Sequence, residues 1–274
     1  SAVLFRGNPN SPGEKVQPGE LAVLSQAGNA PVLPVNESTR TTTGRRIAYA
    51  THLTNGQHPL TARVFVNRIW QHNFGRGLVD TASDFGRNGS RPSHPDLLDW
   101  LARRFIEEDW SIKALHRLIL TSRAYRQAST IQEKGLALDG EARFLWHFPI
   151  RRLEAEAIRD SVLAVSGNLN LRMGGPGFNF FKTRGGLSGF PIVETFGDQG
   201  WRRMIYAHKV RMERAPVFGA FDCPDAGQAT PKRSRAVTAL QALNLFNSRF
   251  MTEQSDVFAA RVEKEAGPDP GKQV

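Results

Sequence analysis

A cluster of basic and aromatic residues in the last third of the chain could bind an anionic ligand. Within residues 201–214, five cationic side chains are balanced by a single acid, Glu213. Guanidinium groups pair with carboxylate, sulfate or phosphate groups, and aromatic rings stack on sugars or bases. The expected ligand-binding residues are Trp201, Arg202, Arg203, Tyr206, Lys209, Arg211 and Arg214, together with Arg233 and Arg235 just before a predicted helix.

Carboxylates and one imidazole form a second set, whose residue types suit acid–base catalysis. Glu156 and Asp160 are four residues apart on a predicted helix, so both carboxylates lie on one face and could act as acid and base. A structural alternative is open, because Arg152 and Glu156 also have the i, i+4 spacing of a helix salt bridge. The acids further along could likewise pair with nearby arginines. The catalytic candidates are Asp84, His94, Glu156, Asp160, Asp222 and Asp225.

The sequence contains only weak patterns of the kind that metal-binding and cofactor-binding sites show. The loop 80–96 has Asp84 and His94, among other polar residues that could hold a hard cation, but their spacing differs from that of a calcium loop. No two of the seven histidines have the i, i+4 spacing of a helical metal site. Cys223 is the only cysteine, which excludes a disulfide, a thiolate zinc cluster and a Cys-x-x-Cys-His haem attachment within the chain. We therefore predict no metal and no cofactor here, and any haem would be held by a neighbouring domain.

Composition places the chain among globular proteins with a basic surface. Hydrophobic residues make up 40% and charged residues 23%, and the formal net charge of +10 is spread along the sequence without a basic tail. Such a surface attracts polyanions in general, whether nucleic acid, sulfated glycan or an acidic protein. No apolar run reaches about 18 residues, so no membrane span is expected. The first residues lack the features of a signal peptide, and both ends resemble cuts within a longer protein.

Periodicity predicts a mainly α fold with short β segments near the N-terminus and long glycine-rich loops. Apolar residues recur at helical spacing after Pro59, Ser93 and Ser111, and again in 151–166, 235–246 and 250–262. Residues 201–212 fit a strand about as well as a helix. Three segments are expected: a strand-and-turn segment 1–45 packed on the main domain, a helical domain 46–265, and a tail 266–274.

Several runs of residues along the chain are distinctive: Arg63–Val79, Asp84–Gly86, Pro92–Leu101, Trp110–Lys113, Leu115–Ile119, Arg151–Asp160, Phe221–Asp225 and Leu240–Leu245. Together they resemble a planctomycete-specific domain of unknown function, one that follows planctomycete cytochrome c domains in long exported proteins. The resemblance covers nearly the whole chain. It implies a multidomain, extracytoplasmic parent protein, periplasmic or on the cell surface, with a cytochrome c domain as neighbour. It supplies no catalytic residues.

Three functions are compatible with these observations. The leading hypothesis is a non-haem accessory or binding module that binds an anionic polysaccharide or an acidic partner domain. The alternative is a hydrolase acting on a polysaccharide or its substituents. Nucleic-acid binding is the least favoured, because only the charge supports it and no DNA- or RNA-binding motif is present. Whether the chain is an enzyme is left open by the sequence.

Overall fold

The computed structural model describes residues 2–25, 30–34, 39, 41–182, 190–193, 196–211, 213–214, 217–224, 227–267 and 271. Within this part of the chain lie eight α-helices and four short strands, so the expected mainly α fold with short β segments is confirmed. The chain forms two compact units, Ser1–Pro149 and Ile150–Val274. The division into segments 1–45, 46–265 and 266–274 stays a prediction.

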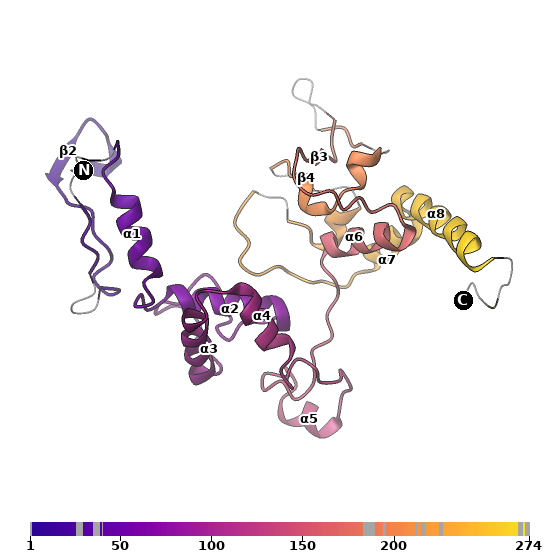
Figure 1. Ribbon diagram of the computed structural model, residues 1–274, viewed down its shortest axis with the longest axis horizontal. Coiled ribbons are helices and arrows are strands. Elements are labelled where there is room, and N and C mark those ends of the chain that lie inside the picture. The colour runs from indigo at the N-terminus through magenta and orange to yellow at the C-terminus, as the bar shows by residue number, and fades with distance from the viewer. Residues whose placement is uncertain are drawn as a thin grey trace. The chain divides into compact units, whose positions relative to one another are not determined.

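The first unit begins with a short hairpin and continues with five helices (Figure 1). Strands β1 (Ala2–Leu4) and β2 (Pro12–Lys15) pair antiparallel, with Ala2 opposite Lys15. Residues 22–24 form a turn. The helices are α1 (Arg45–Thr54), α2 (Thr61–Phe74), α3 (Pro95–Glu107), α4 (Ile112–Leu120) and α5 (Glu133–Leu138).

Helices α2, α3 and α4 enclose the core of this unit. Ala62, Val66 and Trp70 recur every four residues on α2 and are buried, as their helical spacing predicts. Helix α2 ends at Gly75, whose φ of 86° is a left-handed conformation that glycine adopts without a steric penalty. The remaining buried members of the core are Phe74, Leu78, Val79, Leu98, Leu101, Ala102, Phe105, Leu115 and Ile119.

The loop after α2 is fixed by a buried amide. Asn67, which has no exposed surface, donates to the Val79 carbonyl at 2.9 Å and accepts from the Val79 N–H at 2.8 Å. A Cβ on Gly77 would lie 2.5 Å from the same carbonyl oxygen, so only glycine fits there.

The second unit packs helices around an aromatic core. It contains α6 (Ala155–Ser166), α7 (Ala239–Asn247) and α8 (Arg249–Ala266). Strands β3 (Phe178–Asn179) and β4 (Ala207–His208) form a parallel pair of two residues each. Residues 201–211 therefore form neither a long helix nor a long strand, while Met212 lies outside the described residues. The buried core comprises Ala155, Phe178, Phe180, Phe181, Met204, Phe218, Phe221 and Cys223.

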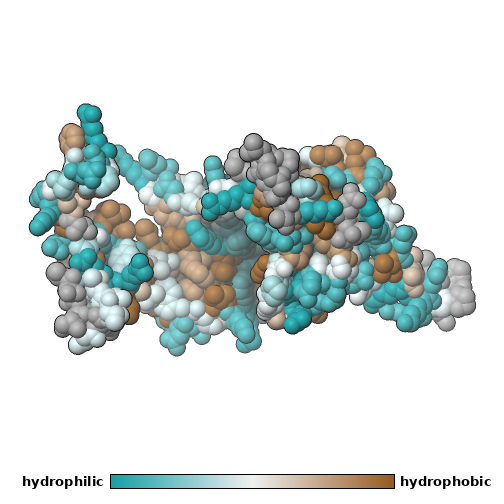
Figure 2. Space-filling view, turned by 90° about the horizontal axis from the view of Figure 1, so that it is seen from above, coloured by the Kyte–Doolittle hydropathy of each residue, from teal (hydrophilic) through white to brown (hydrophobic). Residues whose placement is uncertain are grey.

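Hydrophobic residues also reach the surface of both units (Figure 2). Among the described residues, no helix combines the length and the apolar character that a membrane crossing requires.

Candidate functional site

The N-terminal end of α6 gathers most of the charged residues that the sequence singled out. Gly167, with a φ of 89°, ends this helix, and Leu163 anchors it in the core without exposed surface. Because side chains three and four residues apart share a helix face, Glu156, Arg159 and Asp160 lie on one face of α6.

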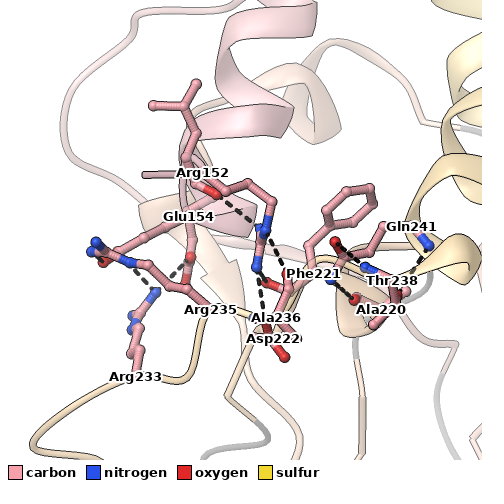
Figure 3. A network of polar contacts seen from close by, with 12 residues as sticks. Arg152, Glu154, Ala220, Phe221, Asp222, Arg233, Arg235, Ala236, Thr238 and Gln241 are labelled. Atoms are coloured by element: carbon pink, nitrogen blue, oxygen red, sulfur yellow. Dashed lines mark hydrogen bonds and ion pairs between the residues drawn. The ribbon is translucent and has the colours of Figure 1, made fainter. Parts of the chain in front are cut away.

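An arginine–carboxylate network joins the start of α6 to residues 233–235 (Figure 3). Arg233 Nη1 lies 3.1 Å from Glu154 Oε2 and 2.7 Å from Glu156 Oε2. Arg235 Nη2 lies 2.9 Å from Glu154 Oε1. Desolvation opposes the charge of Arg233, but the carboxylates outweigh it and the pKa of Arg233 is raised. Both arginines therefore already have anionic partners within the chain.

Asp222 also has hydrogen-bond partners within the chain. Arg152 Nη2 donates to Asp222 Oδ2 at 2.7 Å, and the Ala236 N–H donates to the same oxygen at 2.9 Å. The Arg152 guanidinium lies 5.6 Å from the centre of the Phe221 ring, where a cation–π attraction adds to the pair. Figure 3 shows Arg152 reaching toward Asp222 beside the Phe221 ring. The other predicted acid of this loop, Asp225, lies outside the described residues.

Asp160 holds the segment that follows the glycine-rich loop. Its Oδ1 accepts from the Met204 N–H at 2.8 Å, and its Oδ2 lies 3.5 Å from Arg203 Nε. Arg159, next to it on α6, is fully buried and donates to the carbonyls of Arg202 at 2.8 Å and Gly200 at 2.5 Å. Burial lowers the pKa of Arg159 to about 10, with Asp160 opposing the shift. These contacts fasten residues 200–204 to α6.

Arg202 has a structural position as well. Its side chain is 1% exposed and donates to the carbonyls of Arg172 at 2.9 Å, Gly174 at 2.6 Å and Pro176 at 2.5 Å. Its guanidinium lies 3.6 Å from the centre of the Tyr206 ring. The Tyr206 face is therefore covered by an internal cation, and Arg202 holds the carbonyls of the loop 172–176.

Three of the predicted cations keep exposed side chains. Arg203 is 52% exposed and has only the long contact with Asp160, while Arg211 and Arg214 have no partner among the described residues. Trp201 is half-buried and packs against Phe196.

The cysteine has an unexpected neighbour in Lys209, whose Nζ lies 2.7 Å from Cys223 Sγ, while Glu156 Oε1 lies 3.9 Å from the same sulfur. Burial raises the pKa of the Cys223 thiol, and Lys209 opposes this shift. A buried thiol with a raised pKa is a weak nucleophile at neutral pH. No sequence spacing could have predicted the pair, because fourteen residues and a 3₁₀ turn (Phe218–Phe221) separate them.

The first unit places Asp84 and His94 in separate local interactions. Asp84 Oδ1 accepts from the Gly86 N–H at 2.8 Å, which is the hydrogen bond of an Asx-turn. His94 Nδ1 lies 2.9 Å from Ser93 Oγ, and its ring contacts Phe144 edge-on. His94 precedes α3 without a side-chain cap. Neither residue meets another catalytic candidate within the described contacts of this unit.

A buried cluster that the sequence did not suggest lies at the other end of this unit. Glu20 contacts His52 Nε2, its Oε1 lies 3.4 Å from His58 Nε2, and Tyr49 donates to it at 3.1 Å. Burial opposes ionisation of Glu20, but the hydrogen bonds from Tyr49 and His52 outweigh it, so the pKa of Glu20 is lowered. Two imidazoles and a carboxylate are also ligand types that suit zinc.

The tautomer of His58 argues against a metal at this cluster. His58 Nδ1 accepts from the Leu60 N–H at 3.2 Å and the Thr61 N–H at 3.1 Å, so it carries no proton. The proton of the neutral ring then lies on Nε2, the atom that faces Glu20. Coordination through Nε2 would leave an imidazole without any proton. The donor set fits a buried carboxylate held by hydrogen bonds better than it fits a metal ion.

Searches of curated proteins and of solved structures found no match. A scan against protein families matched residues 45–274 to PSD1, a family described as protein of unknown function (DUF1553). This match covers α1 to α8, and the chain therefore belongs to the PSD1 family of proteins of unknown function.

Proposed function

We propose that the chain is a non-haem binding module that holds an anionic glycan or an acidic partner domain on a basic surface of its second unit. One observation carries this proposal: Arg203, Arg211 and Arg214 are exposed, and they share residues 201–214 with one acid, Glu213. Because the other predicted cations serve internal contacts, these three arginines are the ones left to meet a ligand.

The state of the carboxylates favours binding over hydrolysis. A general acid or base must be able to exchange a proton with the substrate. Glu156 and Asp222 each accept a hydrogen bond from an arginine at 2.7 Å, so both carboxylates are already engaged within the chain. A hydrolase of polysaccharides or their substituents would need one of these acids to be released first.

We also propose a setting for the module, which rests only on the sequence motifs. Their resemblance to the planctomycete-type domain supports a longer, extracytoplasmic parent protein with a cytochrome c domain next to this chain. In that setting the neighbouring domain would hold any haem, and it is a candidate for the acidic partner.

The test is binding of the purified chain to a sulfated polysaccharide, an uncharged polysaccharide and duplex DNA, each at about 50 and 200 mM salt, a range over which polyanion contacts weaken steeply. We expect the sulfated polysaccharide to be preferred at both concentrations. Equal, salt-sensitive binding to every polyanion would mean that net charge alone accounts for the binding, and would contradict a specific glycan site. Absence of binding to all three would leave the acidic protein domain as the ligand to be tested, with the isolated cytochrome domain as the probe.

A triple variant separates the proposed residues from net charge. Arg203→Gln, Arg211→Gln and Arg214→Gln together should weaken binding about tenfold, since exposed ion pairs contribute roughly 0.2–1 kcal/mol each. The matched control replaces Arg68, Arg87 and Arg123, three exposed arginines of the first unit, by Gln. It removes the same charge, so an equal loss in both variants would refute the assigned surface.

A further inference from the structure

A groove between α3 and α4 has the properties of a small-molecule site. The cavity there has a volume of about 380 Å³, which is within the range of ligand pockets. Its floor includes Phe105 and Leu115, each 3% exposed, and the partly buried Leu118. An apolar floor of this kind favours an apolar body, because burying it removes hydrocarbon surface from water.

The groove follows from the sequence of α4. Ala114, Leu118 and Thr121 are spaced by four and three residues, so they form one stripe along the helix, and all three line the cavity. On the adjacent stripe, Leu115 and Ile119 pack into the core, and Leu115 also forms part of the cavity floor. Because Ala114 has the smallest side chain of its stripe, the space above it stays open.

Most polar groups at the rim are already engaged. Arg104 Nη2 lies 2.6 Å from Glu108 Oε1, and Ser111 Oγ accepts from the Ala114 N–H as the cap of α4. Thr121 Oγ1 donates to the Arg117 carbonyl at 2.8 Å. The exception is the exposed guanidinium of Arg117, which also lines the cavity and has no ion-pair or hydrogen-bond partner among the described residues.

We propose that this groove binds a monocarboxylate with an aromatic or short alkyl body. The apolar floor would take the body, and Arg117 would pair with the carboxylate. Glu108 lines the same rim beside Arg104, and Glu107 lies 3.5 Å from that arginine, so two carboxylates share one guanidinium there. This charge disfavours a second carboxylate on the ligand, so the site selects monoanions. The site lies in the first unit and is independent of the proposed glycan or partner surface.

The first experiment measures saturable binding of naphthalene-2-carboxylate to the full chain by calorimetry or NMR titration, beside its neutral carboxamide and naphthalene-2,6-dicarboxylate. The monocarboxylate should bind about two- to fivefold more tightly than either relative, a ratio in line with one partly exposed ion pair. Arg117→Gln should abolish the preference over the carboxamide. The matched control Arg68→Gln, on an exposed position of α2, should leave it unchanged.

Two filling variants locate the ligand. Ala114→Met fills the open space from within, and Thr121→Trp covers the groove from an exposed position that tolerates a large side chain. Each should weaken binding at least tenfold while far-UV circular dichroism and Tm stay near those of the parent chain. If Ala114→Met unfolds the helices, Thr121→Trp alone decides. Three results would each overturn the proposal. They are binding that survives the filling variant, binding unchanged by Arg117→Gln, and no saturable binding up to the solubility limit.

Discussion

Helix α7 faces the second unit with its polar side rather than its apolar side. Gln241 is 4% exposed and donates to the Ala220 carbonyl at 3.0 Å, whereas Phe246 is 83% exposed. Leu240 and Leu243 are also more than half exposed. A helix of a globular protein normally buries its apolar stripe. The orientation of α7 therefore predicts an inverted pattern of mutational sensitivity.

The magnitudes follow from the contacts. Gln241→Ala removes a buried hydrogen bond and leaves the Ala220 carbonyl unpaired, at a cost of about 1–3 kcal/mol. It also removes half of the capping box, in which Gln241 accepts from the Thr238 N–H; losing a cap costs roughly 0.5–2 kcal/mol. We expect a total of about 2–3 kcal/mol. Phe246→Ala removes a ring that buries little surface, and should stay within about 0.5 kcal/mol.

The assay must report on this unit alone, because four of the five tryptophans lie in the first unit and two units need not unfold together. Hydrogen exchange of the α7 amides, read by mass spectrometry, meets this need. A loss of about 2 kcal/mol corresponds to roughly 30-fold faster exchange in Gln241→Ala. Phe246→Ala should exchange at nearly the parent rate outside the helix end. If Phe246→Ala accelerates exchange as much as Gln241→Ala does, the helix packs through its apolar face and the reasoning is refuted.

Three further predictions concern other parts of the chain. Arg159→Met should lower the free energy of unfolding by about 2 kcal/mol or more, because two backbone carbonyls lose their donors; a stability equal to the parent by hydrogen exchange of α6 would contradict this. Cys223 should react with a thiol reagent much more slowly than free cysteine at pH 7, since burial raises its pKa, and Lys209→Met should slow it further; fast labelling of the folded chain would disprove the burial. Asp99 has a pKa lowered by the hydrogen bond from Arg63 at 2.6 Å, so this pair should contribute less than about 1 kcal/mol, present above about pH 4 and lost as the pH falls through the lowered pKa. The free energies of unfolding of Asp99→Asn and the parent should differ at neutral pH and converge at low pH. A difference that does not change with pH would contradict the prediction.

Helical spacing in the sequence was a sound guide to the core helices of the first unit. Ala62, Val66 and Trp70 were expected on one face of α2, and they are buried there. Phe65 of the same helix is 36% exposed. Ser93 does not cap α3, because His94 occupies the cap position and Ser93 Oγ donates to the Leu78 carbonyl at 3.3 Å.

Charge pairing was much harder to predict. The i, i+4 pair of Arg152 with Glu156 was a reasonable expectation, but Arg152 pairs with Asp222, seventy residues away, and Glu156 pairs with Arg233. Arginine side chains are long enough to reach several candidates, so their choice depends on which loops the fold brings near. The same holds for Arg202, which lies among carbonyls and not on the surface.

The sequence by itself determined the local properties of this protein: the mainly α class, the boundaries of most helices, the excess of arginine, and motifs that identify its family. These depend on spacing within a few residues, where helix geometry and capping act directly. Only the tertiary structure decided which charged groups are internal and which are free, which face of α7 turns inward, and where α3 and α4 leave a groove. Those outcomes depend on contacts between segments far apart in the chain, where burial makes each polar group require a partner that local sequence cannot specify.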